Sequence, residues 1–220
     1  MDQLYKILSD RWRSIVEKKI CFDFSHVMKV LKGEYNFKII INPSRYRNKR
    51  KLSKISSLNV DFNPLHFNFN KIDNDEVVCN LNIPEEMNQL NFVEDEHKIV
   101  KIIINLFPIL DNHYMLICNP MKELTQKIDF FSLKVACDIC YYNNQRIFVG
   151  FNCIGAASTV NHQHFHIFCD FPYEFPIMDF LGNLKETGIP MLNLNINYPF
   201  PFFAIQYEPL ISDEILKQCF

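Results

Sequence analysis

Two stretches of the chain have apolar residues at the spacing that is typical of helices. Over residues 4–18 an apolar position recurs every three or four residues, with arginine and lysine between them. This pattern predicts an amphipathic helix that packs one face on a core. Residues 129–142 show a second helical pattern, for which Ser132 is the expected N-terminal cap. The buried stripe of this second helix should consist of Leu133, Val135, Ala136, Ile139 and Cys140.

Apolar runs bounded by polar turns predict the strands. Phe37–Ile41 is a short β-prone run ended by an Asn-Pro pair, and two strongly apolar strands are expected over Val100–Phe107 and Tyr114–Cys118. Two more strands are expected over Arg146–Asn152 and Val160–Cys169. The order of helix, antiparallel strands, helix and strands predicts one α+β domain built on an antiparallel sheet. A chain of 220 residues fits one such domain, because domains usually have about 100–200 residues.

Three further segments are less regular. Residues 65–72 alternate phenylalanine with asparagine, which predicts a strand with one apolar face. The polar turn at residues 73–75 separates this strand from Glu76–Leu81, so we expect the two to form a hairpin. Residues 84–97 are polar and acidic and read as a surface excursion, and residues 45–54 form a basic loop without apolar periodicity.

Composition excludes several classes of function. The 23 basic and 25 acidic residues give a net charge of −2, which excludes the strongly basic surface that non-specific nucleic-acid binding demands. There are only 5 glycines and no glycine-rich phosphate loop, so any phosphate group must be held by side chains or by isolated backbone turns. The 21 phenylalanines indicate a well-filled core or a pocket with aromatic walls.

The N-terminus and the cysteines bear on the compartment. The first residues lack the pattern of a signal peptide, and no apolar run approaches the ~18 residues that span a bilayer. Of the 8 cysteines, Cys137 and Cys140 form the one C-x-x-C pair, which a four-cysteine zinc site would need twice. The pair falls late in the predicted helix rather than at its start, so two buried small side chains are favoured over a redox site. We therefore expect a cytoplasmic protein with no membrane partner.

Three histidines, His162, His164 and His166, alternate along the last predicted strand. In a strand such residues lie on one face, about 6.6 Å from one another. The pattern allows an exposed polar face, a metal site made by two of the histidines with a distant ligand, or nucleophilic catalysis. The apolar residues on both sides of the strand argue against an exposed polar face. Catalysis is favoured because neutral imidazole is a good nucleophile near pH 7. In that case the central ring would attack and the outer rings would orient it and hold a phosphate oxygen.

The segment just upstream of these histidines consists mainly of small residues. It runs from Gly150 to Thr159 and contains a second glycine, two alanines and a serine. Small side chains let backbone N–H groups approach an anion, and the Ser158 or Thr159 hydroxyl can hydrogen-bond it. An ordinary turn is the alternative; beside the three histidines, the segment favours a phosphate pocket.

The motif Asn161-His162-Gln163-His164-Phe165-His166 resembles that of the histidine-triad superfamily. A closer resemblance over roughly residues 4–175 is to the family of GDP-D-glucose phosphorylases and plant GDP-L-galactose phosphorylases. Its segments are Leu8–Trp12, the Asn42…Arg45…Lys49-Arg50 loop, Phe67-Asn68-Phe69-Asn70-Lys71-Ile72, Phe107-Pro108…His113-Tyr114-Met115-Leu116-Ile117, and Phe148-Val149-Gly150-Phe151-Asn152 followed by the histidine motif.

The resemblance implies a fold and a domain organisation. The fold would be a histidine-triad-like α+β domain, an antiparallel half-barrel with flanking helices, over residues 1–220. Its catalytic core would cover about residues 30–175, and the C-terminal part would be shorter than in the family. The chain has Asn112 where the family usually has glycine, and asparagine tolerates the left-handed conformation.

The resemblance also implies a two-step nucleotidyl transfer. His164 would attack the α-phosphorus of a GDP-hexose and release hexose 1-phosphate, and inorganic phosphate would then release GDP from the guanylyl-histidine. His162 would orient His164, while His166, Ser158 and Thr159 would contact phosphate oxygens. The remaining implied binding residues are Asn152, which would contact phosphate or ribose, the cations Arg45, Lys49 and Arg50, and the pocket residues Asn68, Asn70 and Lys71. No metal or other cofactor is needed, and related transferases imply a homodimer.

Three alternative functions stay open. The intermediate could react with water or a sugar phosphate, which would make the protein a nucleotide hydrolase or a nucleotidyltransferase. The chain could be a degenerate relative that binds nucleotide without turnover, or a metal-binding module that uses the histidine strand.

Overall fold

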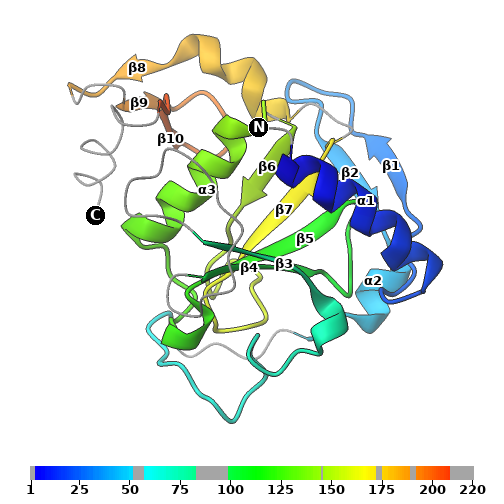
Figure 1. The fold of residues 1–220 in the computed structure, drawn as a ribbon. Coiled ribbons are helices and arrows are strands. Elements are labelled where there is room, and N and C mark those ends of the chain that lie inside the picture. Colours follow the sequence, from blue (N-terminus) through cyan, green and yellow to red (C-terminus); the bar gives the residue numbers. More distant parts are fainter. Residues whose placement is uncertain are drawn as a thin grey trace.

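A five-stranded antiparallel sheet forms the centre of the molecule (Figure 1). The computed structural model describes residues 3–51, 57–82, 99–144, 146–171, 175–188 and 192–208. The strand order in the sheet is β3-β4-β5-β7-β6, and every neighbouring pair is antiparallel. The strands are β3 (Val77–Asn82), β4 (Ile99–Ile104), β5 (His113–Cys118), β6 (Ile147–Gly150) and β7 (Phe165–Cys169).

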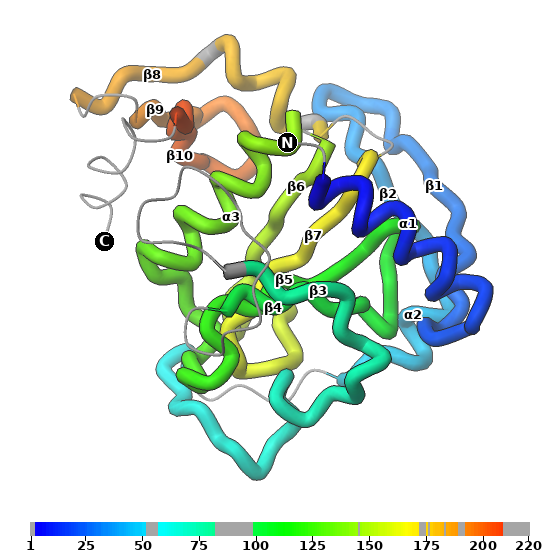
Figure 2. Tube along the Cα trace, viewed as in Figure 1, coloured from blue at the N-terminus to red at the C-terminus, as the bar shows by residue number. Residues whose placement is uncertain are grey.

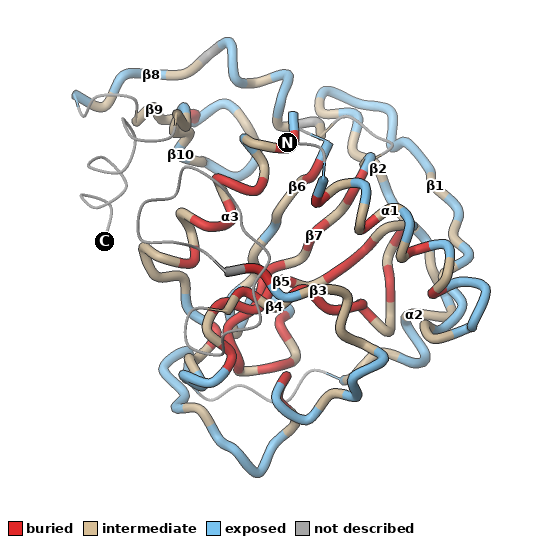
Figure 3. Tube along the Cα trace, in the orientation of Figure 1, coloured by how far each residue is buried: buried red, intermediate tan, exposed pale blue. Residues whose placement is uncertain are grey.

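Two helices, α1 (Gln3–Glu17) and α3 (Phe130–Tyr142), cover one face of this sheet (Figure 1). Alternate strand residues face the helices, among them Ile102 in β4, Leu116 in β5 and Ile167 in β7, and all three are fully buried. The residues between them, such as Ile103 and Ile117, belong to a second, smaller core on the opposite face. Figure 3 shows the buried positions gathered in the central strands and on the inner sides of the two helices. The predicted α+β architecture on an antiparallel sheet is confirmed.

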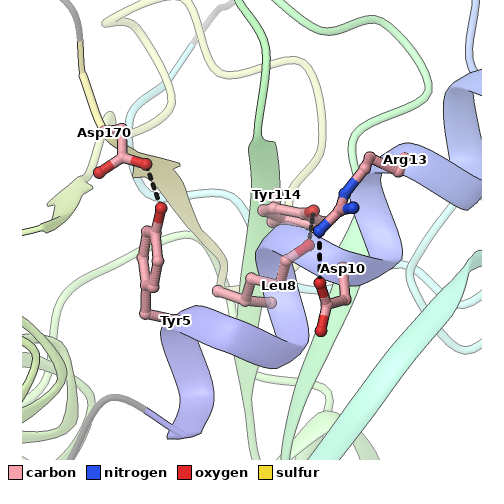
Figure 4. A network of polar contacts seen from close by, with 6 residues as sticks. All are labelled: Tyr5, Leu8, Asp10, Arg13, Tyr114 and Asp170. Atoms are coloured by element: carbon pink, nitrogen blue, oxygen red, sulfur yellow. Dashed lines mark hydrogen bonds and ion pairs between the residues drawn. The ribbon is translucent and has the colours of Figure 1, made fainter.

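Helix α1 is fixed to the sheet by its apolar stripe and by polar contacts with Tyr114 in β5 and with Asp170 just after β7 (Figure 4). The Tyr114 hydroxyl donates to the Leu8 carbonyl at 2.6 Å, which satisfies a buried phenol. The Tyr5 hydroxyl donates to the Asp170 carboxylate just beyond β7, and the Arg146 guanidinium stacks on the Tyr5 ring. The predicted amphipathic helix is therefore confirmed.

Helix α3 begins one turn before the predicted cap. The Asp129 carboxylate accepts the Ser132 N–H at 2.8 Å, so Asp129 is the N-cap, and Ser132 lies at the third helical position. The prediction of Ser132 as cap is therefore wrong, because two residues with capping chemistry compete and the earlier one lies where the backbone is extended. Cys137 and Cys140 are half-buried beyond the first turn, and burial raises their pKa values to about 12 and about 11. Within α3, Val135, Ala136 and Ile139 are buried, whereas Leu133 and Cys140 are half-buried.

The smaller elements surround the sheet (Figure 2). They are the hairpin β1 (Val27–Val30) with β2 (Lys38–Ile41), the helix α2 (Pro43–Asn48), the 3₁₀ turns η1 (Asn74–Glu76), η2 (Pro120–Lys122) and η3 (Pro176–Asn183), and the sheet of β8 (Lys185–Glu186), β9 (Leu192–Asn195) and β10 (Phe202–Ile205). The small C-terminal sheet lies near one end of α3 (Figure 2). Among the described residues, none of the helices combines the length and apolar character needed to cross a membrane.

Three predictions for the chain between β2 and β4 are corrected or fall outside the structure. Residues 65–72 form turns rather than a strand, and β3 pairs with β4 and not with this segment, so the predicted hairpin is wrong. Part of the expected basic loop is helical, because Asn42 caps α2 by accepting the Arg45 N–H at 2.8 Å. The excursion predicted over residues 84–97 lies outside the described residues.

Candidate active site

A cavity of about 430 Å³ opens on the face of the sheet opposite α1 and α3. Met115 of β5 and His166 of β7 contribute to its floor. The other walls come from the end of α2, the turns at residues 67–69, the loop after β4 and the small-residue segment after β6. Eight of the predicted site residues line this cavity: Arg45, Lys49, Arg50, Asn152, Ser158, Thr159, His164 and His166.

His164 lies in the cavity wall with its ring orientation fixed. Its Nδ1 atom is 2.7 Å from the His162 carbonyl oxygen, which can only accept, so Nδ1 carries the proton. The lone pair of the neutral ring is therefore on Nε2. The backbone on both sides of this ring is held by Gln126, whose Oε1 accepts the His164 N–H at 2.8 Å and whose Nε2 donates to the His164 carbonyl at 3.0 Å.

Burial keeps the His164 ring neutral. Desolvation is the main cause that lowers its pKa to about 3, and the nearby His166 lowers it further. Because the pKa lies below the ordinary value of about 6.5, the ring keeps its lone pair throughout the neutral pH range. A neutral, oriented imidazole in a cavity wall has the properties of a nucleophile.

His162 lies behind the cavity rather than in its wall. Its Nδ1 atom accepts the Phe69 N–H at 3.1 Å, which places the ring proton on Nε2, and burial lowers its pKa to about 4. Its contact with His164 runs through its own backbone carbonyl and not through its ring. His162 is therefore placed to position the His164 ring through its backbone carbonyl and to anchor the turn that carries Phe69.

His166 is held by a fourth histidine, His113. The Ile109 N–H donates to His113 Nδ1 at 2.9 Å, so the proton of neutral His113 is on Nε2. That atom is 2.9 Å from His166 Nδ1, which must accept, and the proton of His166 is therefore on Nε2. Because His166 lines the cavity, this arrangement provides a neutral N–H donor beside His164. Burial, with the charge of Arg45, lowers the His166 pKa to about 4.

The small-residue segment forms a tight turn at the edge of the cavity. Gly155 has a φ of +94°, a backbone conformation that residues with a Cβ atom rarely adopt, so glycine is strongly favoured there. The Asn152 amide donates to the Ala156 carbonyl at 3.0 Å and closes the turn from inside. Ser158 is buried and its hydroxyl donates to the Val160 carbonyl at 3.1 Å, which leaves its oxygen lone pairs as acceptors. Thr159 also lines the cavity.

Basic side chains form the opposite wall. Arg45 is half-buried, and burial lowers its pKa although the group stays charged at neutral pH. Arg50 stacks on the Phe67 ring, with its guanidinium carbon 3.4 Å from the ring centroid. Lys49 completes the group at the end of α2. Facing neutral histidines, these cations make the cavity suited to an anion.

The other three predicted pocket residues do not line this cavity. Asn68 is buried and holds its own turn, because its amide donates to the Pro64 and His66 carbonyls. The Asn70 amide donates to the Pro120 carbonyl, and the Lys71 ammonium donates to the Leu65 and His66 carbonyls. The alternating pattern instead places two aromatic rings, Phe67 and Phe69, in the cavity wall.

Two residues that matter for the site are not singled out by the sequence pattern. Gln126 follows η2, and its side-chain amide holds the backbone of His164, just before β7, and the Asn152 carbonyl. His113 reaches His166 only because the register of β5 and β7 pairs His113 with Phe168. The sequence shows that His113 stands at the start of an apolar strand. It does not show the contact with His166, because that contact depends on the pairing of two distant strands.

We expect Gln126→Leu to lower the free energy of unfolding by about 2–4 kcal/mol, because the His164 N–H, the His164 carbonyl and the Asn152 carbonyl would lose a buried partner. Urea denaturation of the variant and of the wild type measures this difference. Gln206→Leu, at an exposed position, is the matched control and should change stability by less than about 0.5 kcal/mol. A loss below 1 kcal/mol for Gln126→Leu would contradict the role given to its amide.

No group of three or more histidine, cysteine, aspartate or glutamate residues with the arrangement of a metal site occurs in the part of the chain that the structure describes. Each histidine of the motif uses its Nδ1 nitrogen for a backbone or histidine contact, as described above.

Comparison with known proteins places these features in context. A family model described as GDPGP1-like, N-terminal domain, matches residues 3–168. Human GDP-D-glucose phosphorylase 1 is 30% identical over 139 residues, which cover 63% of this chain and 35% of the human protein. GDP-L-galactose phosphorylase 2 of Arabidopsis thaliana is 28% identical over 198 residues, which cover 84% of this chain and 45% of the plant protein. The chain thus spans less than half the length of these relatives.

The fold is similar to that of a solved phosphorylase. Yeast Ap4A phosphorylase Apa2 in complex with AMP superposes with a TM-score of 0.57 at 19% identity, over 84% of this chain and 55% of the yeast chain. At this identity the likeness concerns the fold alone, and it agrees with the predicted α+β class.

Proposed function

The chain belongs to the family of GDPGP1-like N-terminal domains, and we propose that it transfers a guanylyl group from a GDP-hexose to inorganic phosphate through His164. The relatives named above are GDP-hexose phosphorylases, which supports this class of reaction. The observation that carries the proposal is the contact between His164 Nδ1 and the His162 carbonyl, because it leaves a neutral nucleophilic nitrogen in a cavity with a basic wall.

In the first step the His164 Nε2 lone pair attacks the α-phosphorus of the GDP-hexose. A P–N bond forms, the bond from the α-phosphorus to the bridging oxygen breaks, and that oxygen leaves with its electron pair as part of hexose 1-phosphate. A phosphate monoester with a second pKa near 6 is a good leaving group. In the second step an oxygen of inorganic phosphate attacks the same phosphorus, the P–N bond breaks, and GDP leaves while His164 regains its lone pair.

The surrounding residues fit the charges of this reaction. The His166 N–H, fixed by His113, donates to a phosphate oxygen, and Arg45 with Lys49 offsets the charge of the diphosphate and the incoming phosphate. Ser158 and Thr159 line the same cavity. Asn152 shapes that turn from the cavity side. The homodimer and the single domain over residues 1–220 stay predictions.

Product analysis tests the proposal. The purified protein is incubated with GDP-glucose, with and without inorganic phosphate, and intact mass is measured alongside chromatography of the nucleotides. We expect a GMP adduct on the protein without phosphate, and GDP with glucose 1-phosphate when phosphate is added. GMP as the product in both conditions would identify water as the acceptor and a hydrolase. Thermal stabilisation by GDP without any adduct or product would indicate a non-catalytic nucleotide-binding relative.

A further inference from the structure

A chain of ring contacts extends the cavity away from His164. The Phe69 ring lies 4.9 Å from the His164 ring, centroid to centroid, and the Phe67 ring lies 5.8 Å from that of Phe69. Arg50 covers the far ring, and all four side chains line the same cavity. The Phe69 ring is only 2% exposed, so the flat surface that this end presents is the Arg50 guanidinium over Phe67, on which a nucleobase can stack.

Glu76 is the carboxylate that lines this end of the cavity. It directly precedes β3, and its neighbour Val77 pairs with Ile103 of β4, whose side chain also lines the cavity. One carboxylate oxygen accepts the Asp73 N–H at 3.1 Å in a reciprocal cap of η1, which fixes the side chain. Within the described residues, Glu76 makes no ion pair, although Arg50 is close enough to influence it.

The position of this carboxylate suggests a role that its cap alone does not require. Glu76 is half-buried, and desolvation is the main cause that raises its pKa, with the charge of Arg50 acting against it. Burying a carboxylate without a cationic partner costs free energy unless N–H donors reach it. Its second oxygen has lone pairs to offer such donors, since an ionised carboxylate accepts hydrogen bonds at both oxygens.

Among the bases, guanine alone has two adjacent N–H donors, at N1 and at the 2-amino group, on one edge. Adenine has an acceptor, N1, beside its 6-amino group, so a carboxylate meets a lone pair there. A site that hydrogen-bonds its ligand discriminates more strongly than a site that only fits the ligand's shape, because the wrong ligand leaves a buried polar group unpaired. A carboxylate beyond an aromatic wall is thus suited to select guanine over adenine.

We infer that Glu76 is the specificity-determining residue for guanine, with the Arg50 guanidinium over Phe67 stacking the base and Glu76 accepting its N–H donors. The order along the cavity is that of a nucleotide: reacting histidines for the phosphate, aromatic rings next, and a carboxylate at the far end. This inference deepens the proposed function and rests on it for the identity of the sugar nucleotide.

The test compares Glu76→Gln with the wild type. Glutamine keeps an oxygen for the Asp73 N–H, so the cap and the fold are retained, but one acceptor becomes a donor. Dissociation constants are measured for GDP, for IDP, which lacks the 2-amino group, and for ADP. We expect the wild type to bind GDP about 10-fold more tightly than IDP and about 100-fold more tightly than ADP. In the variant the preference for GDP over ADP should fall at least about 10-fold. The control is Asp75→Asn, an exposed neighbour outside the cavity, which should keep the wild-type ratios.

An unchanged ratio of GDP to ADP affinity in Glu76→Gln, or a wild type that does not distinguish the two, would overturn the inference. The proposed function is judged separately by the covalent adduct. Selective binding of GDP that depends on Glu76, without any adduct from GDP-glucose, would support the inference and contradict the proposed transfer. Equal adduct formation from GDP-glucose and ADP-glucose would support the transfer and overturn the inference.

Discussion

His164→Asn is expected to abolish the covalent GMP adduct and to lower the rate of GDP-glucose turnover by at least about 1,000-fold. The loss follows because no other side chain in the described cavity presents a neutral ring nitrogen with its lone pair free: His166 uses Nδ1 to accept from His113. The asparagine amide can still donate to the His162 carbonyl, so the fold should be kept. Intact mass measurement after incubation with GDP-glucose detects the adduct, and steady-state assays give the rate.

His26→Gln is the control for this variant, because His26 does not line the cavity, and its Nδ1 atom lies 3.4 Å from the Phe24 carbonyl oxygen. It should keep the adduct and the rate. An adduct that persists in His164→Asn would show that another residue is the nucleophile.

The free energy of unfolding is expected to fall steeply as the pH is lowered from 7 to 5. Burial lowers the pKa of His162 and His166 to about 4 and that of His164 to about 3, whereas an unfolded histidine titrates near 6.5. The unfolded chain therefore binds more protons below pH 6.5, and this part of the stability is complete above that pH and lost as the pH falls. At pH 5.5 the loss is about 1.4 kcal/mol for each of these histidines.

Urea denaturation at pH 7.5 and pH 5.5 measures this dependence. His166→Gln removes one of the three groups and should reduce the difference between the two pH values by about 1.4 kcal/mol. A wild type of equal stability at both pH values would show that these rings are not buried in the neutral form.

The regular elements follow from the sequence because their apolar spacing agrees with their final environment. Helix α1 has one buried stripe, and β4 and β5 have apolar residues on both faces because each face packs on a core. The segment with Phe67 and Phe69 misleads because alternation is also produced by a turn whose asparagines bond their own backbone. The alternation of apolar and polar residues does not by itself distinguish a strand from such a turn. The pairing of β3 with β4 decides between them.

The candidate site is predictable where one short motif carries it and not where distant segments meet. His164, His166 and the turn at Ser158 are close in sequence, so their common cavity follows from local pattern. His113 joins them through the register of β5 and β7, and Gln126 joins them through its side-chain amide, which holds the His164 backbone. No local sequence pattern encodes either contact.

The position of β7 between β5 and β6 has a consequence for how ligands act on the molecule. A strand with partners on both sides opens only when the sheet itself opens, so the amides around His166 should exchange with solvent slowly. Helix α2, which carries Arg45, is short and has no buried residues, so its opening costs much less. An anion held between the two would leave the strand almost unchanged and would slow exchange mainly in the helix. The two walls of one cavity thus belong to cooperative units that differ widely in the free energy of local opening.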